Sequence, residues 1–265
     1  MTSSISKSLN KTSFCWKITG DFSSFLRLIW ASKLFSLNRK SSPDKDSNDK
    51  FRMNFGNDEH EIILRRYTGD LDIFFEVFWK ETYHLPANYP TSINSILDLG
   101  ANTGLSAAYF YRHFPLAGIY CVEPDQKNMS VLKLNVEDLI PKDNIHLLQA
   151  AVGRADGEAE LVHSRYAYNQ RVDERTNGTV TVLSMNSILS HFNLEKVDLV
   201  KMDIEGAESL VLTDDRWLKR VRAIFIEFHS ASGLNNGLKI LSENKFRCRT
   251  IENNPMLVFA ENTIF

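Results

Sequence analysis

An acid and two glycines gather in the stretch SILDLGANTGLSAAYF (95–110), where an apolar run leads into a helix-like segment. Asp98 is followed by Gly100, Asn102 and Gly104. Glycines permit a tight turn and leave room for a ligand against the backbone. A carboxylate here repels a pyrophosphate, which prefers bare N–H groups at a helix start. The pattern therefore favours a ligand with an amine or ammonium group.

A second acid closes the next apolar run. Glu123-Pro124 follows Gly104 by 19 residues. An acid at a strand tip can accept hydrogen bonds from both hydroxyls of a ribose. Asn102 stands where the dinucleotide fingerprint Gly-x-Gly-x-x-Gly has its second glycine. The two acids together predict a site for S-adenosylmethionine. Two alternatives stay open: an NAD-dependent oxidoreductase or epimerase, and glycines that serve only helix–strand packing.

Three charged residues end the apolar run VDLVKMDIEG (197–206). In an extended strand, Lys201, Asp203 and Glu205 project to one side. Asp203 and Glu205 could hold a divalent cation that orients acceptor hydroxyls, or one of them could be a base. A salt-bridge network with Lys201 is the third interpretation. Two carboxylates without an obvious third ligand do not define a metal site, so we assign no metal ligand.

The run RAIFIEFH (222–229) adds Glu227 and His229, which share a face of the predicted strand. We expect its tip to lie next to Asp203. A histidine with a pKa near neutrality suits proton removal from an alcohol. We therefore predict His229 as a base and Glu227 as an acceptor ligand, with a structural role as the alternative for each.

Five short apolar runs alternate with helical stretches, which predicts a doubly wound α/β fold. The runs are 95–100, 118–124, 144–153, 197–206 and 222–229. The helical stretches are 103–113, 126–139, 206–219 and 232–244. The last 18 residues read as two strands joined at Asn-Asn-Pro. We expect a mostly parallel, seven-stranded, Rossmann-like sheet with an antiparallel C-terminal hairpin.

We divide the chain into three parts. Residues 1–50 form a basic amphipathic leader and a polar linker, 51–90 a lead-in helical segment, and 91–265 the main domain, with an insertion at 155–185. Residues 1–40 contain seven Lys and Arg against one acid, a net of +6. The leader could dock on the main domain, lie on a membrane surface, or be an organelle-targeting segment.

The composition excludes several classes. The 265 residues have a formal net charge of -2, which gives no reason to expect nucleic-acid binding. Three cysteines without metal spacing fit a reducing compartment. No apolar run approaches the roughly 20 residues of a membrane-spanning helix. We expect a cytoplasmic protein, with peripheral membrane contact through residues 1–40 as an open alternative; the oligomeric state is not predicted.

Four quoted stretches resemble the FkbM family of S-adenosylmethionine-dependent methyltransferases: ILDLGANTGLSAAYFYRHFP, IYCVEPDQKNMSVLKLN, AVGRADGEAEL and VDLVKMDIEGAESLVL. The resemblance runs from about residue 71 to about 228, and KMDIEGAE is its most specific part. It implies a class I methyltransferase fold that acts usually on oxygen, often in sugars or natural-product scaffolds.

The resemblance also implies roles for single residues. The methionine part of the donor would lie against Asp98, Gly100, Asn102 and Gly104, its ribose against Glu123, and its adenine beside Gln149 and Ala150. Ala101 and Pro124 adjoin these residues and belong to the predicted cofactor site. We predict an O-methyltransferase for a hydroxyl-bearing small-molecule or glycan acceptor. A binding module that holds the donor without chemistry is a further alternative.

Overall fold

The structure is a computed structural model. It describes residues 2–37, 48–55, 58–66, 68–87, 89, 92–162, 171–173 and 180–265.

The molecule is built around a seven-stranded sheet in the order β12-β13-β11-β10-β3-β4-β5. Its strands are β3 (Ser95–Leu99), β4 (Gly118–Val122), β5 (Ile145–Leu148), β10 (Val197–Met202), β11 (Val221–Glu227), β12 (Phe246–Ile251) and β13 (Asn254–Asn262). The first five of these run parallel, whereas β13 is antiparallel to both β11 and β12. The predicted fold class is therefore confirmed.

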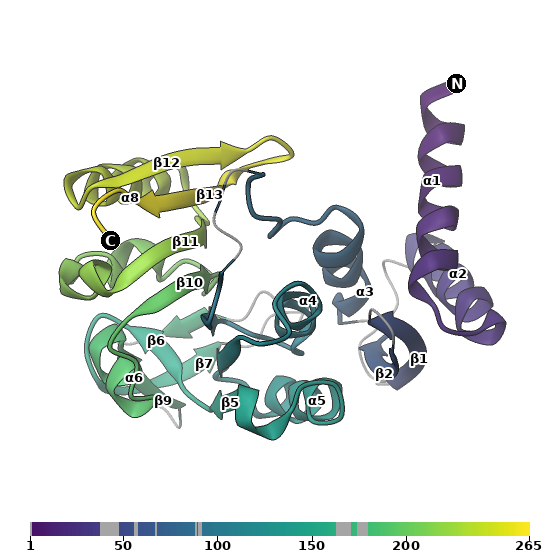
Figure 1. Cartoon of the computed structure of the whole chain (residues 1–265), viewed down its shortest axis with the longest axis horizontal. Helices are drawn as coiled ribbons and strands as arrows, with labels where there is room; N and C mark the ends of the chain where they lie inside the picture. The colour runs from purple at the N-terminus through teal and green to yellow at the C-terminus, as the bar shows by residue number, and fades with distance from the viewer. Residues whose placement is uncertain are drawn as a thin grey trace.

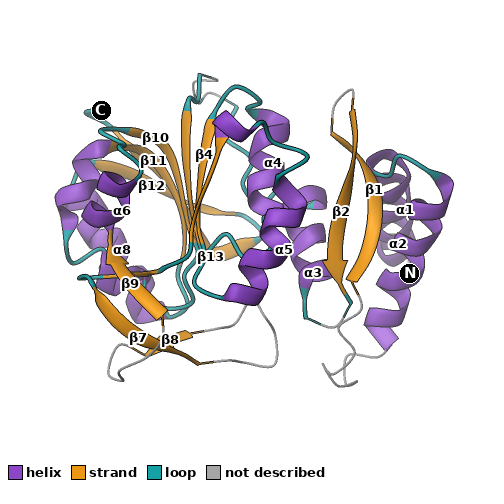
Figure 2. Ribbon diagram, turned by 90° about the horizontal axis from the view of Figure 1, so that it is seen from below, coloured by secondary structure: helices purple, strands orange, loops and turns teal. Residues whose placement is uncertain are grey.

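Helices cover both faces of this sheet, which explains why its strands are apolar on both sides. The helices are α4 (Leu105–His113), α5 (Gln126–Val136), α6 (Met185–His191), α7 (Glu208–Val211) and α8 (Ala231–Glu243). Figure 2 shows α4 and α5 on one side of the sheet and α6 and α8 on the other. A short 3-10 turn, η2 (Lys142–Asn144), leads into β5.

Two predicted elements are divided in the structure. The run 144–153 bends after β5, and its second half, β6 (Ala151–Gly153), joins another sheet. The helix expected over 206–219 consists of the short α7 and a 3-10 segment, η3 (Asp215–Arg220). The break has a local cause: the Asp214 side chain accepts from the Arg216 N–H and starts a new helical turn.

The second sheet is formed by the predicted insertion, in the order β6-β9-β7-β8. Its remaining strands are β7 (Gly157–Val162), β8 (Arg171–Asp173) and β9 (Val180–Ser184). β7 pairs antiparallel with both β8 and β9. The insertion therefore extends one edge of the molecule, beside α6 (Figure 1).

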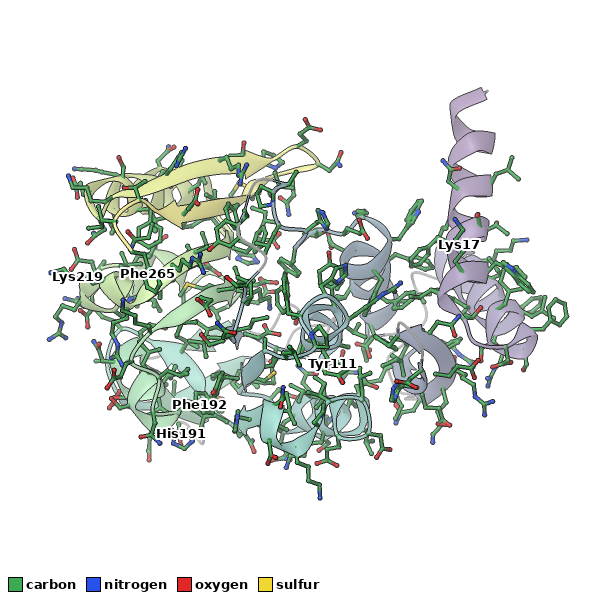
Figure 3. The ribbon with its side chains drawn as sticks, viewed as in Figure 1. Lys17, Tyr111, His191, Phe192, Lys219 and Phe265 are labelled. Atoms are coloured by element: carbon green, nitrogen blue, oxygen red, sulfur yellow. The ribbon has the colours of Figure 1, made fainter. Side chains whose placement is uncertain are left out.

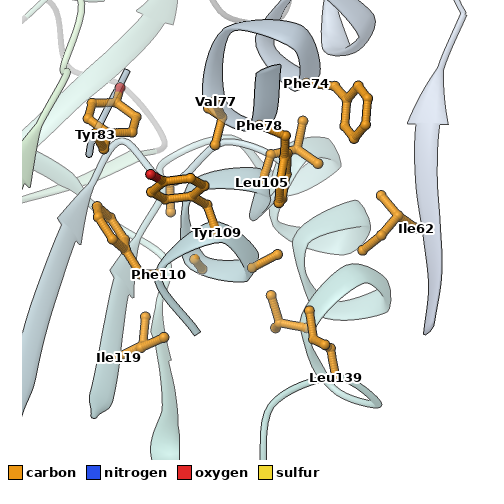
Figure 4. Packing of buried hydrophobic residues seen from close by; sticks show 14 of the residues in the cluster. Ile62, Phe74, Val77, Phe78, Tyr83, Leu105, Tyr109, Phe110, Ile119 and Leu139 are labelled. Carbon is orange, nitrogen blue, oxygen red and sulfur yellow. The ribbon is translucent and has the colours of Figure 1, made fainter. Parts of the chain in front are cut away.

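An aromatic cluster joins the lead-in segment to the main sheet. Helical structure in the segment is limited to α3 (Asp70–Phe74) and one π-helical turn, η1 (Phe75–Trp79), so it covers only a small part of the predicted 51–90. Tyr83 then packs its ring 5.9 Å from Phe110 and 5.7 Å from Phe225. Figure 4 shows Tyr83 facing Phe110 of α4. Burial of each such ring stabilises the fold by about 2–3 kcal/mol.

The first two helices dock on a β-hairpin. They are α1 (Thr2–Ile18) and α2 (Phe22–Leu37), and the hairpin is β1 (Asn48–Phe55) with β2 (Asp58–Arg65). Figure 2 shows the hairpin between these helices and α5. Cys15, Ile18 and Leu28 are buried in this contact. Most of the predicted linker lies outside the described residues.

Candidate active site

The sheet forms a cavity where its strand order reverses, between β3 and β10. Ligands bind at this point in open α/β sheets, at the carboxyl ends of the strands. The cavity has a volume of about 600 Å³, within the range of ligand pockets. The predicted site residues on its wall are Gly100, Ala101, Asn102, Glu123, Pro124, Asp203, Glu205, Glu227 and His229.

The glycine loop is shaped by its contact with the neighbouring strand. Gly100 has a φ of +74°, and a Cβ there would overlap the carbonyl oxygen of Asp203. Gly104 has a φ of +81° and faces Leu132 and Val136 of α5. Gly100 thus lets β3 and the end of β10 approach, while Gly104 lets α5 pack closely. Among the predicted cofactor residues, Gly104 belongs to helix packing and is not on the cavity wall.

Asp98 lies behind the cavity wall and is completely buried. Its carboxylate accepts from the Ser106 hydroxyl at 2.5 Å and lies 3.2 Å from the Lys201 ammonium. The sequence-based expectation of a carboxylate that holds the ligand's ammonium differs from this arrangement, because Lys201 already occupies that position. Asp98 is not on the cavity wall, whereas both of these neighbours are.

Lys201 links the two strands that meet at the cavity. Its ammonium donates to the Gly100 carbonyl at 2.6 Å in addition to its ion pair with Asp98. Burial disfavours the charged ammonium, but the charges of Asp98 and Asp203 outweigh this and raise the pKa of Lys201. The salt bridge expected near Asp203 and Glu205 is therefore made to Asp98 instead, and it fixes the Gly100 loop.

Glu123 is held rigidly at the end of β4. One carboxylate oxygen accepts from the Asn102 N–H at 2.9 Å, and the other from the Asp125 N–H at 3.0 Å and the Asn128 amide at 3.1 Å. Burial raises the pKa of Glu123 to about 7, although these hydrogen bonds work in the opposite direction. Oε1 already accepts two hydrogen bonds, whereas Oε2 accepts one and retains acceptor capacity for a ligand hydroxyl.

Asn102 supplies an acceptor beside Glu123. It adopts a φ of +49°, an unusual conformation for a non-glycine residue. Its Oδ1 is buried and receives no hydrogen bond from any described residue. An amine of a bound ligand would satisfy this oxygen, so the loop fits the amino-acid end of S-adenosylmethionine.

The cavity wall is displaced by two residues from the positions predicted to border adenine. Gln149 and Ala150 lie at the bend after β5 and are not among the described residues that line the cavity, whereas Ala151 and Val152 are. The displacement follows from the early end of β5 at Leu148, which turns Gln149 toward solvent. This part of the cavity wall is therefore formed by the first two residues of β6.

Three carboxylates surround His229. Its Nε2 lies 3.6 Å from Asp203 Oδ1 and 3.3 Å from Glu205 Oε2, and its Nδ1 lies 3.0 Å from Glu208 Oε1. Burial disfavours the charged ring, but the hydrogen bond and charge of Glu208, with the charges of Asp203 and Glu205, raise the pKa of His229 to about 9. This differs from the near-neutral pKa expected from sequence.

Glu208 is the member of this cluster that the sequence reasoning missed. Its side chain is 1% exposed, and Oε1 also accepts from the backbone N–H groups of Ile204 and Gly206 at 3.1 and 3.0 Å. Glu208 thus fixes both the loop after β10 and the orientation of His229. The signal was present in the motif KMDIEGAE, whose last residue is Glu208.

Asp203 and Glu205 come together through a turn. β10 ends at Met202, and Glu205 has a φ of +57°, so the alternation of an extended strand does not place these residues. Burial, together with the nearby Asp203 charge, raises the pKa of Glu205 to about 7; burial also raises the pKa of Asp203. Among the described residues, neither Asp203 Oδ1 nor Glu205 Oε2 receives a hydrogen bond.

Glu227 lines the cavity together with Asp203 and Glu205, and we call these three residues the acidic wall. Its carboxylate accepts from the Asn254 amide at 2.9 Å. Burial and the Asp203 charge raise its pKa. Glu227 therefore faces the cavity in a fixed orientation and can accept a hydrogen bond from a ligand.

Asp203, Glu205 and His229 also have the arrangement of a metal site. One ligand atom from each lies within 4.8 Å of the other two. Glu208 would orient the histidine, as carboxylates do behind metal-bound imidazoles. The cluster therefore brings three possible ligand atoms of a cation close together.

The outer wall of the cavity is aromatic and comes from the N-terminal third of the chain. Trp79 and Tyr83 line it, and so does Lys11 of α1, whose ammonium lies 3.6 Å from the centroid of the Phe75 ring. Tyr166 and Tyr168 of the insertion lie outside the described residues. An aromatic wall of this kind suits an acceptor with an apolar face.

Comparison with known proteins identifies the family. Residues 98–248 match the family model described as "Methyltransferase FkbM domain", which is more than half of the 265 residues. The chain is 28% identical to Methyltransferase sdnD of Sordaria araneosa, over 65% of this chain and 80% of that protein. It is 30% identical to the 2-O-methyltransferase NoeI of Sinorhizobium fredii, over 50% of this chain and 62% of that protein.

Among solved structures, fibrillarin of Aeropyrum pernix, in complex with natively bound S-adenosyl-L-methionine, is similar at a TM-score of 0.47 and 15% identity, covering 81% of this chain and 82% of that chain. The family match coincides with the sheet and the cavity described above. The chain therefore belongs to the FkbM family of S-adenosylmethionine-dependent methyltransferases.

Proposed function

We propose that this chain is an O-methyltransferase that uses His229 as the base for an acceptor hydroxyl. The observation that carries the proposal is the hydrogen bond of 3.0 Å between Glu208 and His229 Nδ1. It directs Nε2 toward the cavity, where the ring can remove a proton. Bound S-adenosylmethionine supplies an electrophilic methyl group, so the protein must align the acceptor oxygen and accept one proton.

The donor half of the site is assigned to the β3 and β4 ends. Glu123 would accept from a ribose hydroxyl through Oε2, and Asn102 Oδ1 would accept from the amine. Pro124, Ala151 and Val152, which line the cavity, would border the adenine. A donor bound here brings a positive charge into the cavity that contains His229. Since like charges disfavour each other, donor binding lowers the pKa of His229 and prepares the ring to act as a base.

The acceptor half is assigned to the acidic wall. Asp203 and Glu205 face Nε2 of His229 at 3.6 and 3.3 Å and would hold the ring until an acceptor hydroxyl arrives. Glu227, fixed by Asn254, would accept a hydrogen bond from a second hydroxyl. Several acceptors of hydrogen bonds in one wall favour a substrate with several hydroxyl groups.

A sugar or glycan is the acceptor that these features favour. Trp79 and Tyr83 line the same cavity as the acids, and sugars present an apolar face beside their hydroxyls. The similarity to NoeI, named a 2-O-methyltransferase, supports transfer to oxygen. A hydroxyl of a related natural product would meet the same contacts.

A divalent cation at Asp203, Glu205 and His229 is the second candidate for the same cluster, because their ligand atoms converge. The two candidates differ in one measurement. A base requires no metal, so treatment with EDTA leaves methyl transfer unchanged; a cation that orients the acceptor is removed, and activity falls.

The proposed function is tested by a methyl-transfer screen with isotopically labelled donor over sugars, glycolipids and small alcohols, read by mass spectrometry. We expect a labelled product whose methyl group is on oxygen, and loss of turnover with retained donor binding in His229→Asn. Product on nitrogen, or unchanged turnover in His229→Asn, refutes the assignment. Binding of NADH in place of S-adenosylhomocysteine would favour an oxidoreductase. Binding of the methyl donor without any methylated product would favour a non-catalytic binding module.

A further inference from the structure

The two N-terminal helices expose large apolar side chains on one face. Phe22, Leu26 and Trp30 follow one another at intervals of four residues in α2 and therefore lie along one side of it. Together with Trp16 of α1 they form a surface that we call the interfacial patch. The exposed fractions of its members are Trp16 58%, Phe22 62%, Leu26 50% and Trp30 66%.

The interfacial patch is continuous across the two helices. The Trp16 ring lies 6.4 Å from Phe22 and 5.3 Å from Phe25. Other side chains hold the helices to the hairpin, since Cys15 and Leu28 are fully buried there. The patch is therefore not used by the packing of the described residues, and exposed apolar patches of this kind commonly mark an interaction surface.

Exposed cations accompany the patch. Lys17 follows Trp16, Arg27 follows Leu26, and Lys33 lies one turn after Trp30. Residues 1–40 carry a net charge of +6 in a chain of net charge -2. Aromatic residues and leucine on one side of a helix, with basic residues beside them, are typical of helices that lie in the headgroup region of a bilayer. Among the described helices, none has both the length and the hydropathy needed to cross a bilayer.

We propose that the interfacial patch binds the surface of an anionic lipid bilayer. The apolar rings enter the boundary of the acyl chains, and Lys17, Arg27 and Lys33 contact the anionic headgroups. A bilayer fits better than a protein surface because the positive charge of residues 1–40 is spread along the sequence beside the apolar side chains.

Bilayer contact also has a consequence for the active site, which rests on the proposed function. α1 carries Trp16 on the patch and Lys11 on the cavity wall. The Lys11 ammonium donates to the Ser32 hydroxyl of α2 at 2.6 Å, which ties the two helices together at this point. Residues five positions apart lie on different sides of a helix, so docking would place α1 between the bilayer and the aromatic wall of the cavity.

Sedimentation with vesicles tests the patch without donor or acceptor, so the outcome is independent of the acceptor assignment. We expect the full chain to bind vesicles of equimolar phosphatidylcholine and phosphatidylglycerol, more weakly as salt rises, and to bind pure phosphatidylcholine poorly. The combined variant Phe22→Ser, Leu26→Ser and Trp30→Ser should bind at least tenfold more weakly. Leu134→Ser, at a leucine of α5 that is 56% exposed, is the matched control.

A charge pair provides the second arm. Lys17→Glu should weaken binding about fivefold or more, since each basic residue near the surface contributes about 1 kcal/mol. Lys219→Glu makes the same change at an exposed lysine on the opposite side of the molecule and should leave binding unchanged (Figure 3).

Tryptophan fluorescence tests the wild-type chain, in case the combined variant fails to fold. Lipids with brominated acyl chains should quench Trp16 and Trp30, which are exposed, while Trp217 is fully buried. Absence of vesicle binding, absence of quenching, or binding that is unaffected by the patch variants overturns the proposal. A dimer in solution that the combined variant converts to monomer also overturns it and identifies a second copy as the partner.

Discussion

Replacement of Glu208 by glutamine should lower the pKa of His229. Glu208 Oε1 accepts from Ile204 N–H, Gly206 N–H and His229 Nδ1 at 3.0–3.1 Å. Glutamine retains an oxygen for these donors, so Glu208→Gln removes the charge while the loop after β10 keeps its hydrogen bonds. This makes the variant a specific test of electrostatics and not of packing.

The expected size follows from the loss of a charge-assisted hydrogen bond. Hydrogen bonds to charged groups contribute about 1.5–3 kcal/mol and neutral ones about 0.5–1.5 kcal/mol. The difference of about 1.4 kcal/mol corresponds to about one pKa unit. The pKa of His229, about 9 in the wild type, should therefore fall to about 8 in Glu208→Gln.

Glu208→Gln also changes how the stability of the folded protein depends on pH. Folding raises the pKa of His229 from 6.5 to about 9, so the folded state binds this proton more tightly. The resulting stabilisation, about 3 kcal/mol at most, is complete below pH 6.5 and is lost as the pH rises through 9. In Glu208→Gln the contribution is about 2 kcal/mol and is lost by about pH 8.

Histidine ring signals in NMR spectra measure this pKa directly. His229→Asn assigns the signal by its disappearance, and Glu243→Gln, at an exposed glutamate of α8, is the control that makes the same chemical change elsewhere. A pKa of His229 that is the same in Glu208→Gln and wild type refutes the assigned role of Glu208. A wild-type pKa of His229 near 6.5 refutes the arrangement of Asp203, Glu205 and Glu208 around the ring.

Three further changes test the donor half. Gly100→Ala should lower the free energy of unfolding in urea by about 2–4 kcal/mol, because Gly100 has a positive φ and a Cβ there would overlap neighbouring backbone. Gly157→Ala is the control and should have little effect, because a Cβ at Gly157 meets open space. Lys201→Met should lower the free energy of unfolding by about 3–5 kcal/mol, because the Asp98 carboxylate is left without its cation. The double variant with Asp98→Asn should recover part of this loss. A double variant that is no more stable than Lys201→Met contradicts the ion pair. Glu123→Ala should weaken binding of S-adenosylhomocysteine by about 1–3 kcal/mol in calorimetry, and wild-type affinity would exclude Glu123 from the ribose site.

Much of the donor half could be predicted from sequence because its determinants are local. An apolar run that ends in Asp98-Leu99-Gly100 defines a strand, a turn and the end of the sheet where ligands bind. Glu123 closes the neighbouring strand in the same way. β3 and β4 then pair in parallel and bring these two strand ends together, which the alternation of strand and helix already required.

The partners of each charged side chain could not be predicted, because they depend on where strands end and how their turns fold. Lys201 pairs with Asp98 across the β3–β10 contact instead of with Asp203. Gln149 turns away from the cavity because β5 stops at Leu148. The leader pattern predicted a helix with an apolar face, but only the structure shows that Leu28 is buried while Phe22, Leu26 and Trp30 remain exposed.

The sequence by itself determined the parallel sheet, the glycine loop and the acids at the strand ends, since hydrophobic periodicity and backbone requirements are properties of neighbouring residues. The tertiary structure decided the chemistry of the acceptor half. Glu208 and His229 are separated by 21 positions in the sequence, yet they lie 3.0 Å apart. They meet because β10 and β11 pair in parallel, and because the turn at Glu205 and Gly206 directs α7 back toward the sheet.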